Sequence, residues 1–148
     1  MIEHSKAVAD ELSVLLAESY TLYLKTHSYH WNVTGPMFHG LHTLFETQYT
    51  ELAMAVDALA ERIRALGFKA PGSYKAYAKL STVQDDDTYP DAKTMLANLA
   101  GDHAKVAERA NKVLKLAQQH EDEGTASLAS ARIEIHEKTV WMLRAHLE

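Results

Sequence analysis

The chain has 148 residues, enough for its own hydrophobic core, so we expect a single domain over residues 1–148. Its hydrophobic fraction of 47% is ordinary for a globular protein, and the lack of cysteine excludes a disulfide scaffold and thiolate metal sites. The formal net charge of −5 disfavours nonspecific binding to nucleic acids.

A first long helix is predicted over residues 3–34. Its apolar residues recur at intervals of three and four, which is typical of an amphipathic helix. They are Val8, Leu12, Leu15, Leu16, Tyr20, Tyr23 and Leu24. We interpret Tyr20, Tyr23 and Tyr29 as core or rim aromatics.

The end of this helix carries a candidate metal ligand, His30. The Gly35-Pro36 break that follows favours a tight reversal, which would bring His30 near the start of the next helix. His27, one turn earlier, is interpreted as a hydrogen-bonded surface residue. Trp31 is expected to serve packing first.

A second long helix is predicted over residues 37–66, with Gly67 as its C-terminal cap. The apolar residues again follow the helical spacing and fall in one sector roughly 100° wide. They are Leu41, Phe45, Tyr49, Leu52, Val56, Leu59, Ile63 and Leu66. This helix should therefore bury one face and leave a second face for polar groups. His39, near its start, is interpreted as an exposed residue.

That second face carries four candidate ligands in two pairs, His42 with Glu46 and Asp57 with Glu61. Each pair spans about one helical turn, which suits two ligands on one ion. The pairs lie 15 residues apart, roughly 22 Å, so one ion cannot contact both in a single chain. If a second copy packs antiparallel, the early pair of one chain meets the late pair of the other, and a two-fold axis generates two identical sites. For either pair alone, a solvated helix face is the simpler alternative.

A connection is expected over residues 68–90, with a short helix from Ser73 to Leu80. Three adjacent acids in it are interpreted as a solvated turn and helix-start charge, and they are Asp85, Asp86 and Asp87. A third long helix follows over residues 91–120. Two histidines of this helix lack an acid partner at a metal-binding spacing, so we interpret His103 and His120 as structural.

A fourth long helix is predicted over residues 125–147, after a break at 121–127, with Thr125 or Ser127 as its cap. His136 and Glu137 lie on different faces of it, which argues against a shared ion. Four long helices with a short extra helix between the second and third predict an all-α four-helix bundle. Carboxylates and imidazoles together suit Fe²⁺, with Zn²⁺ or Mn²⁺ as competitors.

Four motifs are similar to those of a known family. They are H-W-x-V-x-G at 30–35, F-x-x-L-H-x-x-F-E at 38–46, D-x-x-A-E-R-I-x-x-L-G at 57–67 and E-K-T-V-W-M-L at 137–143. Together they resemble the Dps-like mini-ferritins and cover nearly the whole chain. The resemblance implies a ferritin-like bundle that assembles into a hollow dodecamer of two-fold dimers. It also implies oxidation of Fe²⁺, preferably by hydrogen peroxide, storage of the ferric mineral in the cage, and protection against oxidative stress.

By resemblance, the iron ligands are His30, His42 and Glu46 from one subunit and Asp57 and Glu61 from the other. Relatives often have Asp where this chain has Glu46, which leaves occupancy of the second iron position open. Ferritin-like bundles that hold iron within one subunit use Glu-x-x-His motifs. No Glu here is followed by His at i+3, which agrees with ligands shared across an interface.

The family also suggests roles for other parts of the chain. The short helix would sit on the second helix and help form the dimer contact. Trp31, beside a ligand, would quench oxidising intermediates. Three adjacent acids would line iron-entry pores: Glu121, Asp122 and Glu123. Ser127 stands where relatives often have another acid.

Some relatives bind DNA through Lys-rich extensions, but only Lys6 lies near the start here, so we expect weak or absent DNA binding. The opening residues lack the apolar core of a signal peptide, and no run approaches about 18 apolar residues, so we expect a cytoplasmic protein without a membrane span. Two alternatives remain: a DNA-compacting or structural helical assembly without ferroxidase activity, and a helical-bundle metal hydrolase with a lone His/carboxylate ion.

Overall fold

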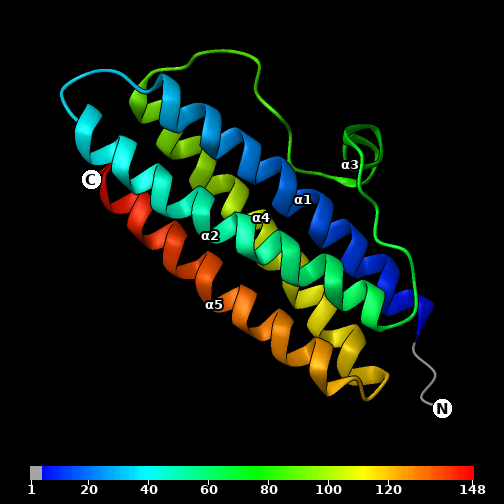
Figure 1. The fold of residues 1–148 in the computed structure, drawn as a ribbon. Helices are drawn as coiled ribbons and strands as arrows, with labels where there is room; N and C mark the ends of the chain where they lie inside the picture. Colours follow the sequence, from blue (N-terminus) through cyan, green and yellow to red (C-terminus); the bar gives the residue numbers. More distant parts are fainter. Residues whose placement is uncertain (1–4) are drawn as a thin grey trace.

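The computed structural model describes residues 5–148 and contains five helices and no strand in this range (Figure 1). The prediction of an all-α four-helix bundle with a short extra helix is confirmed. Residues 3 and 4, which were assigned to the first helix, lie outside the described residues. The helices are α1 (Lys6–Asn32), α2 (Phe38–Ala65), α3 (Tyr74–Leu80), α4 (Ala92–Gln119) and α5 (Glu123–Ala145).

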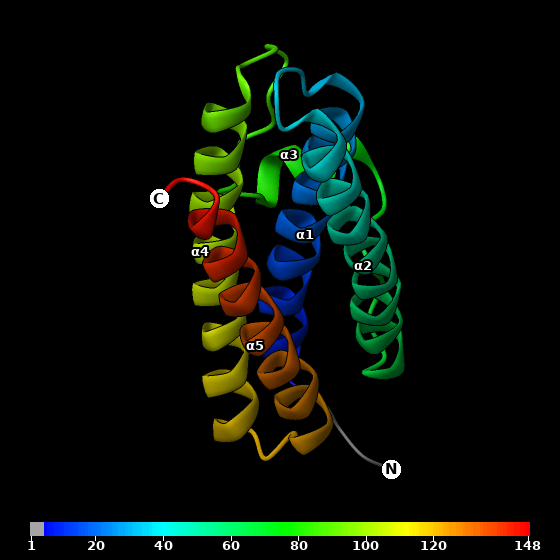
Figure 2. The same cartoon turned by 90° about the vertical axis from the view of Figure 1, so that its left-hand side faces the viewer.

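The four long helices form two neighbouring pairs, α1 with α2 and α4 with α5, and α1 also packs along α4 (Figures 1 and 2). The short helix α3 contacts α1 and no other helix of the described chain. The expectation that it would sit on the second helix is therefore wrong within one chain. Tyr77 explains the difference, because its buried ring stacks on Tyr20 of α1 with a centroid distance of 5.0 Å.

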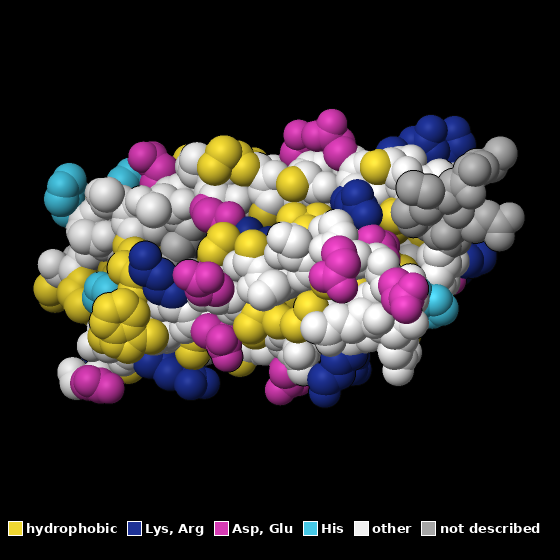
Figure 3. All heavy atoms as spheres, turned by 90° about the horizontal axis from the view of Figure 1, so that it is seen from below, with side chains coloured by type: hydrophobic (Ala, Val, Ile, Leu, Met, Phe, Trp, Pro, Cys, Tyr) yellow, Lys and Arg dark blue, Asp and Glu magenta, His cyan; other side chains and the backbone are white. Residues whose placement is uncertain are grey.

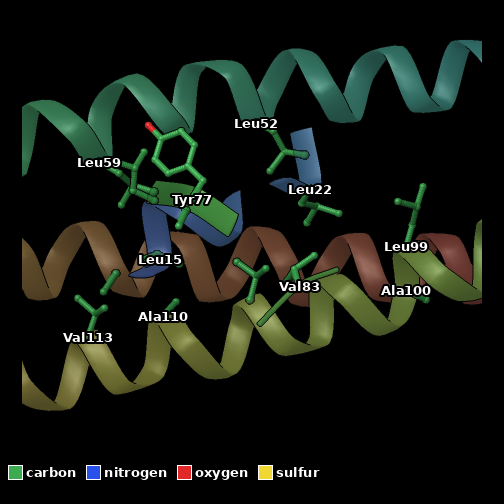
Figure 4. Close-up of a cluster of buried hydrophobic side chains, with 14 of the residues drawn as sticks. Leu15, Leu22, Leu52, Leu59, Tyr77, Val83, Leu99, Ala100, Ala110 and Val113 are labelled. Carbon is green, nitrogen blue, oxygen red and sulfur yellow. The ribbon is translucent and has the colours of Figure 1, made fainter. Parts of the chain in front are cut away.

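The core lies between the four long helices and is built from the predicted apolar sectors. Leu15 and Leu22 of α1 meet Leu52 and Leu59 of α2 and Leu99 of α4 (Figure 4). Each is at most 1% exposed, and burying such a side chain contributes about 1.5–3 kcal/mol. Helical spacing of apolar residues therefore determined which face of each helix points inward.

The start of α5 differs from the prediction that Thr125 or Ser127 caps it. Asp122 is the cap residue: its carboxylate accepts a hydrogen bond from the backbone N–H of Thr125 at 3.1 Å. The same carboxylate accepts from Thr125 Oγ1 at 2.6 Å and pairs with Arg62 at 2.8 Å. Its pKa is lowered, because these hydrogen bonds and the Arg62 charge outweigh the opposing effect of burial. The helix thus begins at Glu123, two residues before the predicted start.

The end of α2 follows the prediction. Gly67 comes directly after the last turn and has φ of +99°, a conformation that side-chain-bearing residues rarely adopt. Within residues 5–148, no helix is both long and apolar enough to cross a membrane.

Candidate metal centre

A five-residue reversal between α1 and α2 positions the candidate centre. Gly35 has φ of +104°, and its carbonyl accepts a hydrogen bond from the N–H of Phe38, where α2 begins. The reversal places His30, in the last turn of α1, against His42, near the start of α2. Their rings stack with a centroid distance of 3.8 Å and an interplanar angle of 14°. The expected proximity of these two histidines is confirmed.

The two histidines bond to each other's backbone. His30 Nδ1 lies 2.6 Å from the carbonyl oxygen of His42, and His42 Nδ1 lies 2.8 Å from the carbonyl oxygen of His30. A carbonyl oxygen only accepts, so both Nδ1 atoms carry the proton and donate. In the neutral rings, each Nε2 then keeps its lone pair. Histidines held in this way are oriented as metal ligands through Nε2.

Glu46 and two aromatic rings complete this end of the site. Glu46, one turn after His42, lies 3.8 Å from His30 Nε2 with its carboxylate more than half exposed. Phe38 stacks on His42, and Tyr49 contacts His30 edge-on. His30 itself is only 6% exposed. An ion at the two Nε2 atoms would therefore have an apolar wall on the protein side and a flexible carboxylate on the open side.

Asp57 and Glu61 lie further along α2 and are exposed, as predicted. A hydrogen bond that the protonated Glu61 carboxyl donates to Asp57, together with the like charge of that neighbour, raises the pKa of Glu61. Two adjacent anions of this kind favour a cation between them. Across residues 5–148, no group of three or more His, Asp or Glu side chains of one chain is arranged to hold a metal ion by itself. The two pairs are thus separate within the described chain, and metal binding at both stays a prediction.

One interpretation at the end of α1 is wrong. His27 is partly buried rather than a hydrogen-bonded surface residue: its ring packs at a tilt on Trp31, with a centroid distance of 3.9 Å, and stacks on Tyr49 at 4.2 Å. Trp31 packs on His27 and is otherwise 58% exposed within one chain, so its first role in packing stays a prediction. The signal that was missed is a row of aromatic residues at intervals of three and four on α1, including Tyr20 and Tyr23.

Two acid groups also differ from their interpretation. Asp86 was assigned to a solvated turn, but its carboxylate accepts a hydrogen bond from Tyr29 at 2.5 Å and another from Thr88. Both bonds lower the pKa of Asp86, while burial and the bond to Asp86 raise the pKa of Tyr29. Asp122, one of the three acids suggested to line a pore, instead pairs with Arg62 and caps α5. Glu121 and Glu123 are the exposed acids of that break.

Gly35 and Gly40 form a matched pair that tests the reversal. We expect Gly35→Ala to lower the unfolding free energy by about 1–2 kcal/mol, because φ of +104° strains any residue with a Cβ. Gly40→Ala, inside α2 with open space at its Cβ, should instead raise it by about 0.5–1 kcal/mol. Denaturant titration of both variants measures the difference, and equal values would contradict the strain argument.

Comparison with known proteins agrees with this architecture. A family model described as a ferritin-like domain matches residues 9–148. "DNA protection during starvation protein 2" of Bacillus anthracis is 36% identical and aligns over 97% of this chain and 98% of its own length. A low temperature-induced protein of Nostoc is 38% identical over 99% of this chain and 83% of its own.

Two solved structures have the same fold. A Dps protein of Vibrio cholerae, described as a member of the ferritin-like diiron-carboxylate proteins, has a TM-score of 0.93 and 35% identity, covering 97% of this chain and 90% of its own. A Dps protein of Bacillus brevis has a TM-score of 0.94 and 33% identity, covering 97% and 96%. The chain therefore belongs to the Dps-like mini-ferritins of the ferritin-like superfamily.

Proposed function

We propose that this protein is a ferroxidase and iron-storage mini-ferritin. It oxidises Fe²⁺, preferably with hydrogen peroxide, at centres shared between two-fold related subunits, and it stores the ferric product inside a dodecameric cage. The observation that carries the proposal is the stacked pair of His30 and His42, because reciprocal backbone hydrogen bonds leave both Nε2 atoms free to bind iron.

The centre needs ligands from two chains. His30, His42 and Glu46 supply two neutral nitrogen donors and one carboxylate at one end of α2. Asp57 and Glu61 are the anionic ligands of the partner chain, placed opposite by an antiparallel crossing of two α2 helices. Two carboxylate anchors with imidazoles suit Fe²⁺, and Zn²⁺ or Mn²⁺ would compete for the same donors.

Iron is the substrate and the stored cargo in this proposal. Peroxide accepts two electrons. A centre that holds two Fe²⁺ ions supplies both electrons, so no hydroxyl radical forms. The first ion sits at the two histidines and the partner's acids. Glu46 would complete the second position, and its 3.8 Å separation from His30 Nε2 supports that role. This chemistry protects a cell against oxidative stress.

DNA binding is not part of the proposal, although relatives are named for DNA protection. The net charge is −5, and on the face in Figure 3 basic side chains alternate with acidic ones rather than forming a basic patch. Such a surface disfavours contacts to phosphates. Protection would then come from removing iron and peroxide in the cytoplasm.

The test compares His42→Ala and Asp57→Ala with wild type. Anaerobic Fe²⁺ is titrated into each protein, peroxide is added, and ferric product is followed optically per subunit. Both variants should lose most of the initial rate, because each removes a ligand from every centre. The control is His39→Ala, an exposed residue one turn before His42.

Size-exclusion mass belongs to the same test. The proposal expects an assembly of about twelve times 16.5 kDa for wild type and variants. A monomer, or a full rate in both ligand variants, contradicts the proposal. A dodecamer without iron oxidation would instead favour a purely structural assembly.

A further inference from the structure

A continuous row of tyrosine rings leads away from the candidate centre. Tyr49 contacts His30 edge-on at a centroid distance of 5.1 Å, and Tyr23 contacts Tyr49 at 6.1 Å. Tyr20 follows at 5.7 Å from Tyr23 and stacks on Tyr77 of α3 at 5.0 Å. Tyr74, 70% exposed within one chain, ends the row at 6.2 Å from Tyr20. We call these five residues the tyrosine row.

The row joins three helices that are far apart in sequence. Tyr23 and Tyr20 lie one turn apart on α1, on the same stripe as His30, and α2 and α3 supply the remaining rings. From position 30 to position 20 the stripe covers about 15 Å along α1. Every step is a ring contact within the 4.5–7 Å centroid range at which aromatic side chains pack against each other.

Ring contacts of this kind allow stepwise electron transfer. Tunnelling rates fall exponentially with the gap between π systems, so several short steps are far faster than one long step. Tyrosine is among the few side chains that a strong one-electron oxidant oxidises. Burial raises the pKa of Tyr20 and of Tyr77, so both phenols are neutral at physiological pH and lose a proton when they are oxidised.

We propose that the tyrosine row supplies the second electron for peroxide reduction when a centre holds one Fe²⁺ ion instead of two. This inference rests on the proposed ferroxidase function. The balanced step is Fe²⁺ + H₂O₂ + Tyr–OH → Fe³⁺ + Tyr–O• + OH⁻ + H₂O. Iron and tyrosine each lose one electron, the O–O bond breaks, and the phenol proton forms the water.

The outer end of the row is where the radical is repaired. Tyr20, Tyr74 and Tyr77 line a cavity of about 360 Å³ between α1, α3 and the acids at 85–87. At each step along the row the tyrosyl radical gains an electron from the next phenol and takes a proton back, while that next phenol loses its own proton. The radical stops at Tyr74, whose phenol proton passes to water. A small reductant such as ascorbate then returns a hydrogen atom to the tyrosyl radical and restores the phenol.

The experiment maps radicals along the row. Wild-type assembly is loaded with one or two Fe²⁺ per subunit and mixed with one peroxide and a nitroso spin trap, and trapped tyrosines are located by peptide mass spectrometry. At one Fe²⁺ we expect trap on Tyr74 and Tyr77, at several times the level on Tyr89. Tyr89 is a matched control because it is 77% exposed and lies off the row. At two Fe²⁺ the signal should fall several-fold, and ascorbate should remove it.

Breaking the row in the middle gives the direction of transfer. In Tyr20→Phe, trap should disappear from Tyr74 and Tyr77 and remain on Tyr23 and Tyr49. Tyr23→Phe is a second variant, which should move the trap back to Tyr49 alone. Equal labelling of Tyr74 and Tyr89, or Tyr74 labelling that survives both variants, would contradict electron transfer along the row. Either result would mean that freely diffusing radicals label tyrosines according to their solvent exposure.

Ferric product is recorded optically in the same samples, which separates the two ideas. Normal Fe³⁺ formation without trapped tyrosine contradicts electron transfer along the tyrosine row but agrees with the proposed ferroxidase function. No Fe³⁺ formation overturns the ferroxidase and, with it, the oxidant that the row requires.

Discussion

A mixed assembly of two inactive variants is expected to regain about a quarter of the wild-type iron-oxidation centres. One variant is His30→Ala/His42→Ala, and the other is Asp57→Ala/Glu61→Ala. If each centre takes histidines from one chain and acids from its partner, a mixed dimer has one complete centre and one without either set. Equal, random mixing gives half mixed dimers, each with one of two centres active. Initial oxidation rates of the co-refolded mixture measure the recovery.

A control mixture uses variants that are defective in the same half of the centre. His30→Ala mixed with His42→Ala should recover nothing, because every centre still lacks one histidine whichever chains pair. If the first mixture also stayed inactive while assembling at the dodecamer mass, the ligands would not be shared between chains. The two pairs on α2, separate in one chain, would then need another role.

Local sequence signals predicted the helices and half of the candidate site. Apolar spacing placed each helix end within a few residues, and the Gly35-Pro36 break predicted that His30 returns to His42. Both follow from short-range geometry, which a single sequence contains. The meeting of Asp57 and Glu61 with a partner chain stays a prediction, because it depends on how two surfaces dock.

Most of the missed features depend on contacts between distant residues. The position of α3 on α1 follows from Tyr77 stacking on Tyr20, 57 positions earlier in the chain. Asp122 caps α5 in part because Arg62 of α2 is near enough to hold its carboxylate. His27 is held between rings of α1 and α2. Only Trp31, one turn from His27, lies at a helical spacing that the sequence shows. The partners Tyr77, Arg62 and Tyr49 lie at no periodic spacing, so no local pattern signals them.

The same limit applies to the buried histidines His103 and His136, which were interpreted as structural and as unsuited to share an ion with Glu137. Their Nδ1 atoms lie 2.8 Å apart, and Arg132 Nη2 lies 3.0 Å from His136 Nε2. Arginine only donates, so His136 accepts at Nε2 and donates from Nδ1 to His103. Arg132 also pairs with Glu51 of α2 at 2.6 Å. This network links three helices through neutral imidazoles.

We therefore expect the fold to lose stability as pH falls below about 6.5. Burial and the Arg132 charge lower the pKa of His103 to about 3, and burial with both neighbours lowers that of His136. Below pH 6.5, the histidine pKa in the unfolded chain, the unfolded state binds protons that the buried histidines do not. The unfolding free energy therefore declines from pH 6.5 until the pH passes the folded pKa. For His103 alone the loss is about 3 kcal/mol by pH 4.

The measurement is a series of denaturant titrations between pH 7.5 and about pH 4 at fixed protein concentration. His103→Gln/His136→Gln keeps polar groups beside Arg132 but removes both titrations, so its stability should fall less steeply than that of wild type below pH 6.5. His146→Ala, an exposed histidine on the final turn, should retain the wild-type slope. Carboxylates titrate equally in all three proteins, so the difference in slope isolates the buried pair. Parallel curves would mean that the pair accepts protons in the folded core without cost.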